Sequence, residues 1–342
     1  MLRSMKHNGS KRETVLKYYD VATSFVSKLP GGLQRPILRE MTPIREVYLE
    51  TRPVRLMLMG ATTPETFLSE LAGADKKIEP GANDNGWREY CVDDNGRVQI
   101  FHVDEKCSKD FVSAALMRFQ PDAIIVSGLG GDAVRTVDFI AMSEAAVIGR
   151  VAEEHVVATV TQLADNPILA KRGVRVFPLS DPEGFETAVC DALPMCAQLE
   201  FSWITGAKHL QATLAKSLLK SFSAVCGVIG LQPIPLADMP ILVTLQMLMV
   251  SLIIHTTGRR ADARMIGEFF GALGINVGLG FGFRELARSV IKVIPFWGNA
   301  VSGALAAAGT YAIGHAAIAY FVDVQPLDRV SANFRKRKKK QA

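Results

Sequence analysis

The stretch VRLMLMGATTPETFL, residues 54–68, decides how the rest of the chain is interpreted. Its apolar part predicts a buried strand over residues 56–59 that stops at Gly60, because a short apolar run closed by glycine is typical of such strands. Pro64 fits the first turn of a helix, where its missing N–H is not needed. A strand that leads through a glycine into a helix is the expected place for a phosphate-binding loop.

The loop itself lacks most of the residues that bind phosphate. Such loops follow G-x-x-x-x-G-K-[ST], whose glycines let main-chain amides surround the phosphates, while the lysine and the hydroxyl serve the outer phosphate and Mg²⁺. Counted from Gly60, the last three motif positions hold Glu65, Thr66 and Phe67. A loop one residue shorter restores the hydroxyl as Thr66 but puts Glu65 at the lysine position. Either alignment puts a carboxylate near the expected triphosphate, where its charge is unfavourable.

Composition indicates two domains with a neutral body and a basic end. A chain of 342 residues that is 49% hydrophobic is large enough for two cores. The formal net charge is +5, but the run RKRKKK at residues 335–340 contributes +6, which leaves the remainder near −1. Five cysteines without a C-x-x-C or a pairing pattern favour a reducing cytosol. Residues 1–12 carry cations but no apolar segment after them, so we do not expect a secretory signal.

Two helices are predicted ahead of the first strand. Residues 13–28 have one apolar face, and the Pro-Gly-Gly at residues 30–32 ends that helix. A second helix is predicted from Pro36 to about Thr51 and ends before Arg52-Pro53, since a residue that precedes proline is disfavoured in a helix. We expect this lead-in to pack against the domain that follows it.

The middle of the chain alternates between helices and short apolar strands. After a helix to Ala72 and a polar stretch at residues 74–86, the predicted elements are strands at 87–92 and 98–103 joined by the turn DDNG, a helix at 108–119, a strand at 122–126, a helix at 133–147, a strand at 155–161, a strand at 173–177 and a helix at 185–193. This alternation predicts a mostly parallel sheet with ligands at the carboxyl ends of its strands.

The order of these elements resembles a GTPase domain of the Era/dynamin-like bacterial kind. The resemblance is carried by the lead-in from LREMTPIREVY, residues 38–48, to Gly60, and by three later motif positions. The D-x-x-G position is DEKC at 104–107, which keeps the aspartate. The N/T-K-x-D position is QLAD at 162–165, which also keeps only the aspartate, and the S-A-K-like position is LSD at 179–181. The resemblance implies a degenerate P-loop GTPase-like α/β domain, and GTP or GDP with Mg²⁺ as the cofactor if one binds.

The resemblance further implies a vestigial nucleotide site without catalytic residues. Its members would be Gly60, Thr62, Thr63, Thr66, Asp104, Gln162, Asp165 and Ser180. Each also has a plainer explanation, since Asp104 can cap its loop, Asp165 can start a turn, and Gly60 is needed by the turn alone. Loss of the loop lysine and second glycine removes several kcal/mol of transition-state stabilisation. The six histidines lack the spacing of metal ligands, so no metal site is expected.

The C-terminal third predicts an apolar, all-α domain. A long helix at residues 199–227 opens it, and the segments GLQPIPLADMPILVTLQMLMV (230–250) and IPFWGNAVSGALAAAGTYAIG (294–314) resemble the helical C-terminal domain of unknown function that many such GTPases carry. The apolar run at 240–254 is too short to span roughly 30 Å of hydrocarbon, whereas 301–322 is long enough. Small residues in the latter allow close helix packing in a membrane or in a soluble bundle, and both interpretations stay open.

Two groups of cations are candidate lipid contacts. One is a predicted basic helix face and the other is the basic end: Arg284, Arg288 and Lys292, and Arg335, Lys336, Arg337, Lys338, Lys339 and Lys340. Basic residues near anionic lipid contribute about 1 kcal/mol each and favour the cytoplasmic side. A solubilising tail is the alternative. No aromatic residue interleaves with these cations, so nucleic acid is not an expected partner.

These observations predict four segments and one preferred function. The segments are a helical lead-in (1–52), the GTPase-like domain (53–198), the helical, membrane-associated domain (199–325) and the basic tail (326–342). The preferred function is a pseudo-GTPase scaffold or regulatory partner at the cytoplasmic face of the inner membrane, with protein partners or self-association through the helical domain. One alternative is a true GTP-binding protein in which the hydroxyls of Thr62, Thr63 and Thr66 replace the lysine, and another is a membrane-remodelling or channel-like bundle.

Overall fold

A computed structural model describes most of the chain as two compact units. The described residues are 15–16, 18–24, 26–27, 31–48, 51–60, 62–93, 96–104, 106–127, 138–165, 167–231, 238–274 and 299–341. One unit is Glu50–Leu210, and the other joins Met1–Leu49 to Gln211–Ala342. The lead-in therefore belongs to the same unit as the C-terminal helices, whereas we expected it to pack against the α/β domain. A hydrogen bond from Tyr48 Oη to the carbonyl of Leu214 (3.3 Å) illustrates this.

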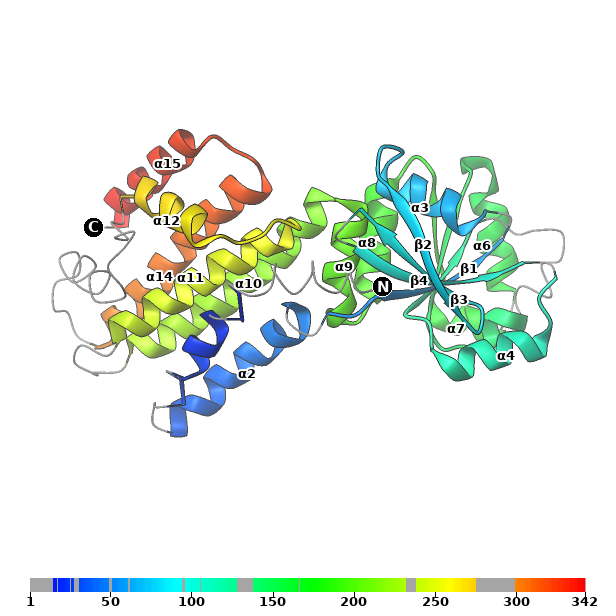
Figure 1. Cartoon of the computed structure of the whole chain (residues 1–342), viewed down its shortest axis with the longest axis horizontal. Coiled ribbons are helices and arrows are strands. Elements are labelled where there is room, and N and C mark those ends of the chain that lie inside the picture. The colour runs from blue at the N-terminus through cyan, green and yellow to red at the C-terminus, as the bar shows by residue number, and fades with distance from the viewer. Residues whose placement is uncertain are drawn as a thin grey trace. The chain divides into compact units, whose positions relative to one another are not determined.

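The α/β unit contains seven strands in one sheet (Figure 1). Its elements in chain order are β1 (Val54–Met59), α3 (Pro64–Ala72), β2 (Ile78–Asp84), β3 (Trp87–Val92), β4 (Gly96–Val103), α4 (Lys109–Arg118), β5 (Ala123–Val126), β6 (Ala146–Val151), η1 (Glu153–His155), α6 (Val156–Ala164), α7 (Pro167–Arg172), β7 (Arg175–Pro178), α8 (Pro182–Ala192) and α9 (Met195–Thr205). The strand order is β2-β3-β4-β1-β5-β6-β7. Strands β4, β1, β5, β6 and β7 are parallel, and β2 and β3 pair antiparallel at one edge. The predicted mostly parallel α/β sheet, followed by a helical part, is confirmed.

Strand β2 was not predicted from the sequence. Most of its side chains are exposed, and it contains Pro80 and Gly81, both of which weaken a strand signal. Its pairing with β3 shifts register between Pro80 and Asn83. An edge strand tolerates these features because its outer side needs no ladder partner.

The predictions for residues 146–161 were wrong in two places. Residues 146–147 were assigned to a helix but begin β6, which pairs with β5 on one side and β7 on the other. Residues 155–161 were assigned to a strand because of their valines, but α6 begins at Val156. Val157 is 76% exposed on this helix. β-Branched residues favour strands only weakly, and the position between two parallel neighbours decides which segment becomes the strand.

Two apolar cores lie on opposite faces of the sheet. Because side chains alternate along a strand, Leu56 and Leu58 of β1 belong to one core and Met57 and Met59 to the other. The first core includes apolar residues of α3, α8 and α9, and the second includes those of α4, α6 and α7. Each face of the sheet is therefore covered, and its carboxyl edge is left for loops (Figure 1).

The helix predicted at residues 199–227 is broken in the structure. Gly206 has φ of +66° and ends α9, and α10 (Lys208–Gly230) begins two residues later. Glycine adopts this left-handed conformation without the cost that a side chain adds. Phe201 and Ile204 of α9 pack in the core of the sheet, so α9 remains part of the α/β unit.

The second unit is helical. It contains α2 (Gly31–Tyr48), most of α10, α11 (Asp238–Thr256), α12 (Ala263–Ala272), α14 (Asn299–Ala317), the π-helical turn Ile318–Val322 and α15 (Leu327–Gln341). A Cβ atom added at Gly314 would lie 2.4 Å from Leu219 Cδ1 and 3.0 Å from Met249 Cε, so this glycine permits close packing of α14 with α10 and α11. Gln246 Nε2 donates to Thr310 Oγ1 (3.0 Å) between α11 and α14.

Two described helical segments have the length and composition of membrane spans, namely Lys208–Gly230 and Gly303–Val322. The predicted short apolar helix at 240–254 is present as part of α11. In the basic end, the backbone of residues 327–341 is helical, Val330 is buried, and Arg335 and Lys336 are exposed. The predicted lipid contacts Arg284, Arg288 and Lys292 lie outside the described residues, as do the side chains of residues 337–340.

Candidate functional site

The carboxyl edge of the sheet brings several predicted residues together. Register pairs Met59 of β1 with Val103 of β4 and with Val126 of β5, so Gly60, Asp104 and Ser127 follow on neighbouring strands. The chain leaves β1 towards the β4 side and leaves β5 towards β6, so the direction of winding reverses between β1 and β5. Such a reversal is where open α/β sheets usually bind ligands.

The turn from β1 to α3 is confirmed as a strand-glycine-helix connection. Gly60 has φ of +119°, a conformation that favours glycine. Thr63 is the N-cap of α3: its Oγ1 accepts from the main-chain N–H of Thr66 (3.3 Å) and lies 2.9 Å from the hydroxyl of Thr66. The hydroxyl of Thr63 therefore already caps the helix, the hydroxyl of Thr66 is bonded to it, and Thr62 is the candidate that lines the cavity described below.

Glu65 is held by the sheet. Its Oε1 accepts a hydrogen bond from Tyr90 Oη of β3 at 2.9 Å. Burial, together with this carboxylate, raises the pKa of Tyr90 to about 12. The acid that the sequence places in the loop is thus engaged towards β3 and is absent from the residues that line the cavity.

A cavity of about 240 Å³ opens among the carboxyl ends of β1, β5, β6 and β7. It is lined by Thr62, Phe67, Glu70, Ser127, Arg150, Val151, Ala152, His155 and Leu179. Most of these follow the ends of strands or begin helices, so the fold itself positions them. Ser127 is tied to β1, because its Oγ donates to the carbonyl of Met59 at 3.2 Å.

Among the described residues that line this cavity, Arg150 is the arginine. It comes from β6, and its side chain is 10% exposed. Its Cζ lies 5.2 Å from the centroid of the Phe185 ring, and its Nη1 lies 4.0 Å from Glu70 Oε2. Sequence reasoning missed Arg150 because residues 146–147 were assigned to a helix. The signal that could have found it is a single arginine within the apolar run AAVIGRV, residues 145–151.

Asp104 caps its own loop in the structure. Its Oδ1 accepts from the N–H of Lys106 (2.9 Å) and from Cys107 Sγ (3.3 Å). Partial burial raises the pKa of Asp104, but these hydrogen bonds outweigh it, so the net shift of the pKa is downward. The carboxylate therefore has the geometry of the loop-capping alternative.

The remaining predicted residues divide between two ends of the sheet. Ser180 is exposed at the carboxyl edge, one residue after Leu179, whose N–H donates to the carbonyl of Val151 (3.0 Å). Gln162 lies in the last turn of α6 and Asp165 directly after it. The nine residues of α6 carry the chain about 13 Å away from the carboxyl edge where the helix begins. The structure therefore does not bring Gln162 and Asp165 to the other predicted residues.

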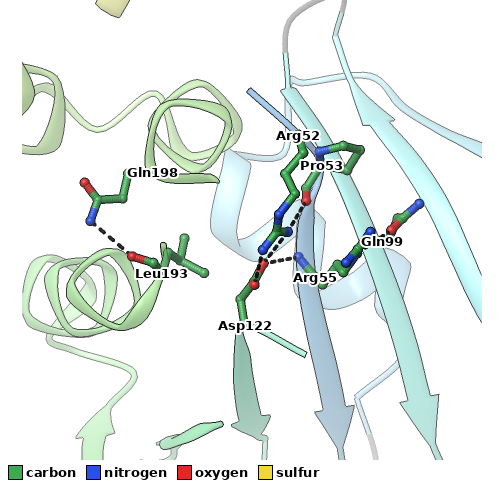
Figure 2. Close-up of polar contacts among 7 residues, drawn as sticks. All are labelled: Arg52, Pro53, Arg55, Gln99, Asp122, Leu193 and Gln198. Carbon is green, nitrogen blue, oxygen red and sulfur yellow. Dashed lines mark hydrogen bonds and ion pairs between the residues drawn. The ribbon is translucent and has the colours of Figure 1, made fainter. Parts of the chain in front are cut away.

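The opposite, amino edge is held by a charged cluster (Figure 2). Arg52 Nη1 donates to Asp122 Oδ2 at 2.9 Å and to the carbonyl of Pro53 at 3.0 Å, and its Nη2 pairs with Oδ1 of the same aspartate. The main-chain N–H of Arg55 also donates to Asp122 Oδ2 (2.9 Å). Figure 2 shows Arg52 and Asp122 facing each other at the starts of β1 and β5. This cluster fixes the two strands at the end far from the cavity, which makes it a structural feature.

The largely buried carboxyl group of Glu186 is expected to make the stability of this unit depend on pH. Its side chain is 14% exposed, and burial raises its pKa from 4.5 to about 7, against the opposing effect of Arg150. Between these values the folded state keeps a proton that the unfolded state releases, so stability falls as the pH rises through this window, by about 1–3 kcal/mol. In Glu186→Gln this contribution should vanish. Urea unfolding at pH 5 and pH 8 measures it, and an unchanged pH slope in the variant would contradict the assignment.

Among the described residues, no group of three or more His, Cys, Asp or Glu side chains is arranged to hold a metal ion. Comparison with known proteins adds no assignment: no family model matches the sequence, and no curated protein matches it significantly.

Proposed function

We propose that this chain is a membrane-associated, GTPase-like scaffold or regulatory protein whose α/β unit does not hydrolyse nucleotide efficiently. The observation that carries the proposal is the β1–α3 turn. It occupies the position of a phosphate loop, but it lacks the motif lysine and the second glycine, and Thr63 and Thr66 use their hydroxyls on each other. The described residues that line the cavity beside it include no lysine.

The missing groups matter for catalysis more than for the fold. Phosphoryl transfer depends on cations and amides that stabilise charge on the transferred phosphate, and loss of one such donor commonly costs several kcal/mol of transition-state energy. The sheet, by contrast, depends on hydrophobic pattern and register. A domain can therefore keep the architecture of a switch protein and lose its turnover.

The helical unit supports the membrane part of the proposal. Two helical segments in the described part of the chain, Gly303–Val322 and Lys208–Gly230 (most of which lies in this unit), have the length and apolar composition of spans, and α15 carries exposed cations at Arg335 and Lys336. Apolar helices next to a basic segment match the arrangement that attracts anionic lipid on the cytoplasmic side of a membrane. We propose that this unit also provides the contact with protein partners or with a second copy.

Two measurements on the full chain test the proposal. After expression, carbonate extraction of membranes should leave the protein at least partly in the membrane fraction. The purified protein should then show no GTP hydrolysis above the rate without protein, with Mg²⁺ present. Complete release by carbonate together with recovery in the soluble fraction would contradict membrane association, and sustained GTP turnover would contradict the loss of catalysis.

A GTP-binding protein with an atypical loop is the second candidate, and Arg150 in the cavity is the observation that favours it. In that case Glu65→Lys should raise GTP affinity, because it removes a carboxylate and adds a cation at the position that aligns with the motif lysine when the loop is one residue shorter. Glu65→Gln is the matched control, since it removes the negative charge without adding a positive one. Unchanged GTP affinity in Glu65→Lys would contradict this second candidate.

A further inference from the structure

Arg150 is buried in an unusual way for an arginine. Its side chain is 10% exposed, and both Nε and Nη1 are buried without a hydrogen bond to any residue that the structure describes. Arginine has five N–H donors, and buried donors in native proteins almost always have partners. A buried cation that lacks close hydrogen-bonded partners is costly, so such a group requires a reason.

The neighbours of Arg150 satisfy it only in part. Phe185 lies under the guanidinium, a favourable cation–π contact that uses no N–H group. Glu70 is 4.0 Å from Nη1, which is too long for a hydrogen bond, and its side chain is 48% exposed. Glu186 of α8 also acts on Arg150 electrostatically, and its raised pKa means that much of it is neutral near pH 7. The guanidinium therefore keeps unused hydrogen-bonding capacity beside a cavity.

The cavity is suited to an anion on independent grounds. Two nine-residue helices, α3 and α6, begin next to it, at Thr62–Pro64 and at His155–Val156. The N-terminus of a helix carries partial positive charge. Most of the first main-chain N–H groups are already used here, because Pro64 has none, the N–H of Thr66 donates to Thr63 Oγ1, and those of His155 and Val156 donate to the carbonyls of Ala152 and Glu153. The cavity thus combines the partial positive charge of two helix N-termini, the hydroxyl of Thr62 and one buried guanidinium.

We propose that Arg150 is the anchor of an oxyanion site at the carboxyl ends of β1, β5 and β6, and that the site takes a phosphate or pyrophosphate group. The guanidinium would use its free N–H groups on two phosphate oxygens, the bidentate geometry that arginine adopts with phosphate. The site supplies from β6 a positive charge that the β1–α3 loop does not contain.

The size of the cavity limits the ligand. Pockets that enclose drug-sized ligands measure roughly 300–1,000 Å³, and this one is about 240 Å³. Inorganic phosphate or pyrophosphate fits such a volume, whereas a nucleoside triphosphate would have to leave most of its base and sugar outside. The shared chemistry is a phosphate group, whether free or at the end of a nucleotide.

Three variants of the full chain test the site, with isothermal titration of inorganic phosphate and of pyrophosphate as the probes. Arg150→Gln should lower the pyrophosphate affinity roughly tenfold or more, because it removes charge-assisted hydrogen bonds. Glu70→Gln should raise that affinity about two- to fivefold, because it removes a competing carboxylate. Arg118→Gln is the control: it removes the same charge from an exposed pair with Asp84 at the far end of α4 and should leave the affinity unchanged.

The two variants are expected to change the pyrophosphate affinity in opposite directions, so the proposal can still be tested with Glu70→Gln if Arg150→Gln does not fold. Glu70→Gln changes an exposed residue, and a variant that folds but binds pyrophosphate no better than the unmodified chain would show that Arg150 only anchors α3. Failure of the unmodified chain to bind either phosphate or pyrophosphate would also overturn the site. If GTP competes with pyrophosphate, the natural ligand carries its phosphate on a nucleotide. If pyrophosphate binds and GTP does not compete, the natural ligand is a free phosphate. Either outcome supports the site.

The site and the proposed function can fail separately. The site requires neither a membrane nor a GTPase ancestry, so loss of phosphate binding would leave the carbonate extraction and the missing GTP turnover unaffected. Conversely, GTP turnover would overturn the proposed function and leave the oxyanion site in place.

Discussion

Replacing Arg97 with alanine is expected to lower the free energy of unfolding of the α/β unit by about 3–5 kcal/mol. Arg97 Nη2 donates to Glu200 Oε1 at 2.9 Å, and the main-chain N–H of Arg97 donates to Oε2 at 3.0 Å. Glu200 is fully buried, while Arg97 is 28% exposed. Removing the arginine side chain takes the cation of this pair away from a fully buried carboxylate, and loss of one partner of a buried ion pair is strongly destabilising.

The same pair makes two further measurements informative. Glu200→Ala should cost less than Arg97→Ala, because the guanidinium that remains is partly exposed and can reach water. The double variant Arg97→Met/Glu200→Leu should recover much of the lost stability, since well-packed apolar residues often replace a buried ion pair at little cost. Urea unfolding followed by the fluorescence of the unit's Trp87 and Trp203 measures all three. If the free energy of unfolding of either single-substitution variant lies within about 0.5 kcal/mol of that of the unmodified chain, the expected role of this ion pair is contradicted.

The second large effect is expected at Asp122, where alanine should cost about 2–4 kcal/mol. Asp122 is 7% exposed and accepts from the guanidinium of Arg52 and from the main-chain N–H of Arg55. The substitution leaves both donors without this acceptor at the point where β1 enters the sheet. Because Arg52 is 30% exposed, water can compensate part of the loss, which places the value below that of Arg97→Ala.

A matched control separates burial from charge. Asp84 pairs with Arg118 at 2.8 Å, but both side chains are about half exposed. Asp84→Ala removes the same type of ion pair and should cost less than about 1 kcal/mol. Equal losses for Asp84→Ala and Asp122→Ala in the same urea titration would show that the amino-edge cluster gains nothing from its burial.

The turn at Gly60 could be predicted because its signals are local. An apolar run, a glycine and a proline within residues 54–64 encode a strand, a left-handed turn and a first helical residue, whatever surrounds them. The same holds for β3 and β4, whose boundaries agree with the prediction to within two residues. Alternation of such elements then implied a parallel sheet with its ligand edge at the ends of the strands.

The positions of β6 and α6 could not be predicted from local signals of this kind. Residues 146–151 and 155–161 are both rich in valine and alanine, and local propensity cannot rank two similar segments. The parallel partners β5 and β7 make the first segment a strand. The same pairing carries Gln162 and Asp165 away from the carboxyl edge, so the motif position assigned to them by sequence spacing did not correspond to a place in the site.

The sequence by itself determined the type of the molecule: an α/β sheet with a strand-glycine-helix turn that lacks a phosphate-loop lysine, followed by apolar helices. Tertiary structure alone decided where the charges lie. Glu65 is drawn to Tyr90 of β3, and Arg150 is brought from a strand some 90 residues away in sequence to the cavity beside Thr62. The physical reason is that secondary structure follows from short-range pattern, whereas the burial and pairing of a charge depend on strand order and register, which join residues distant in the chain.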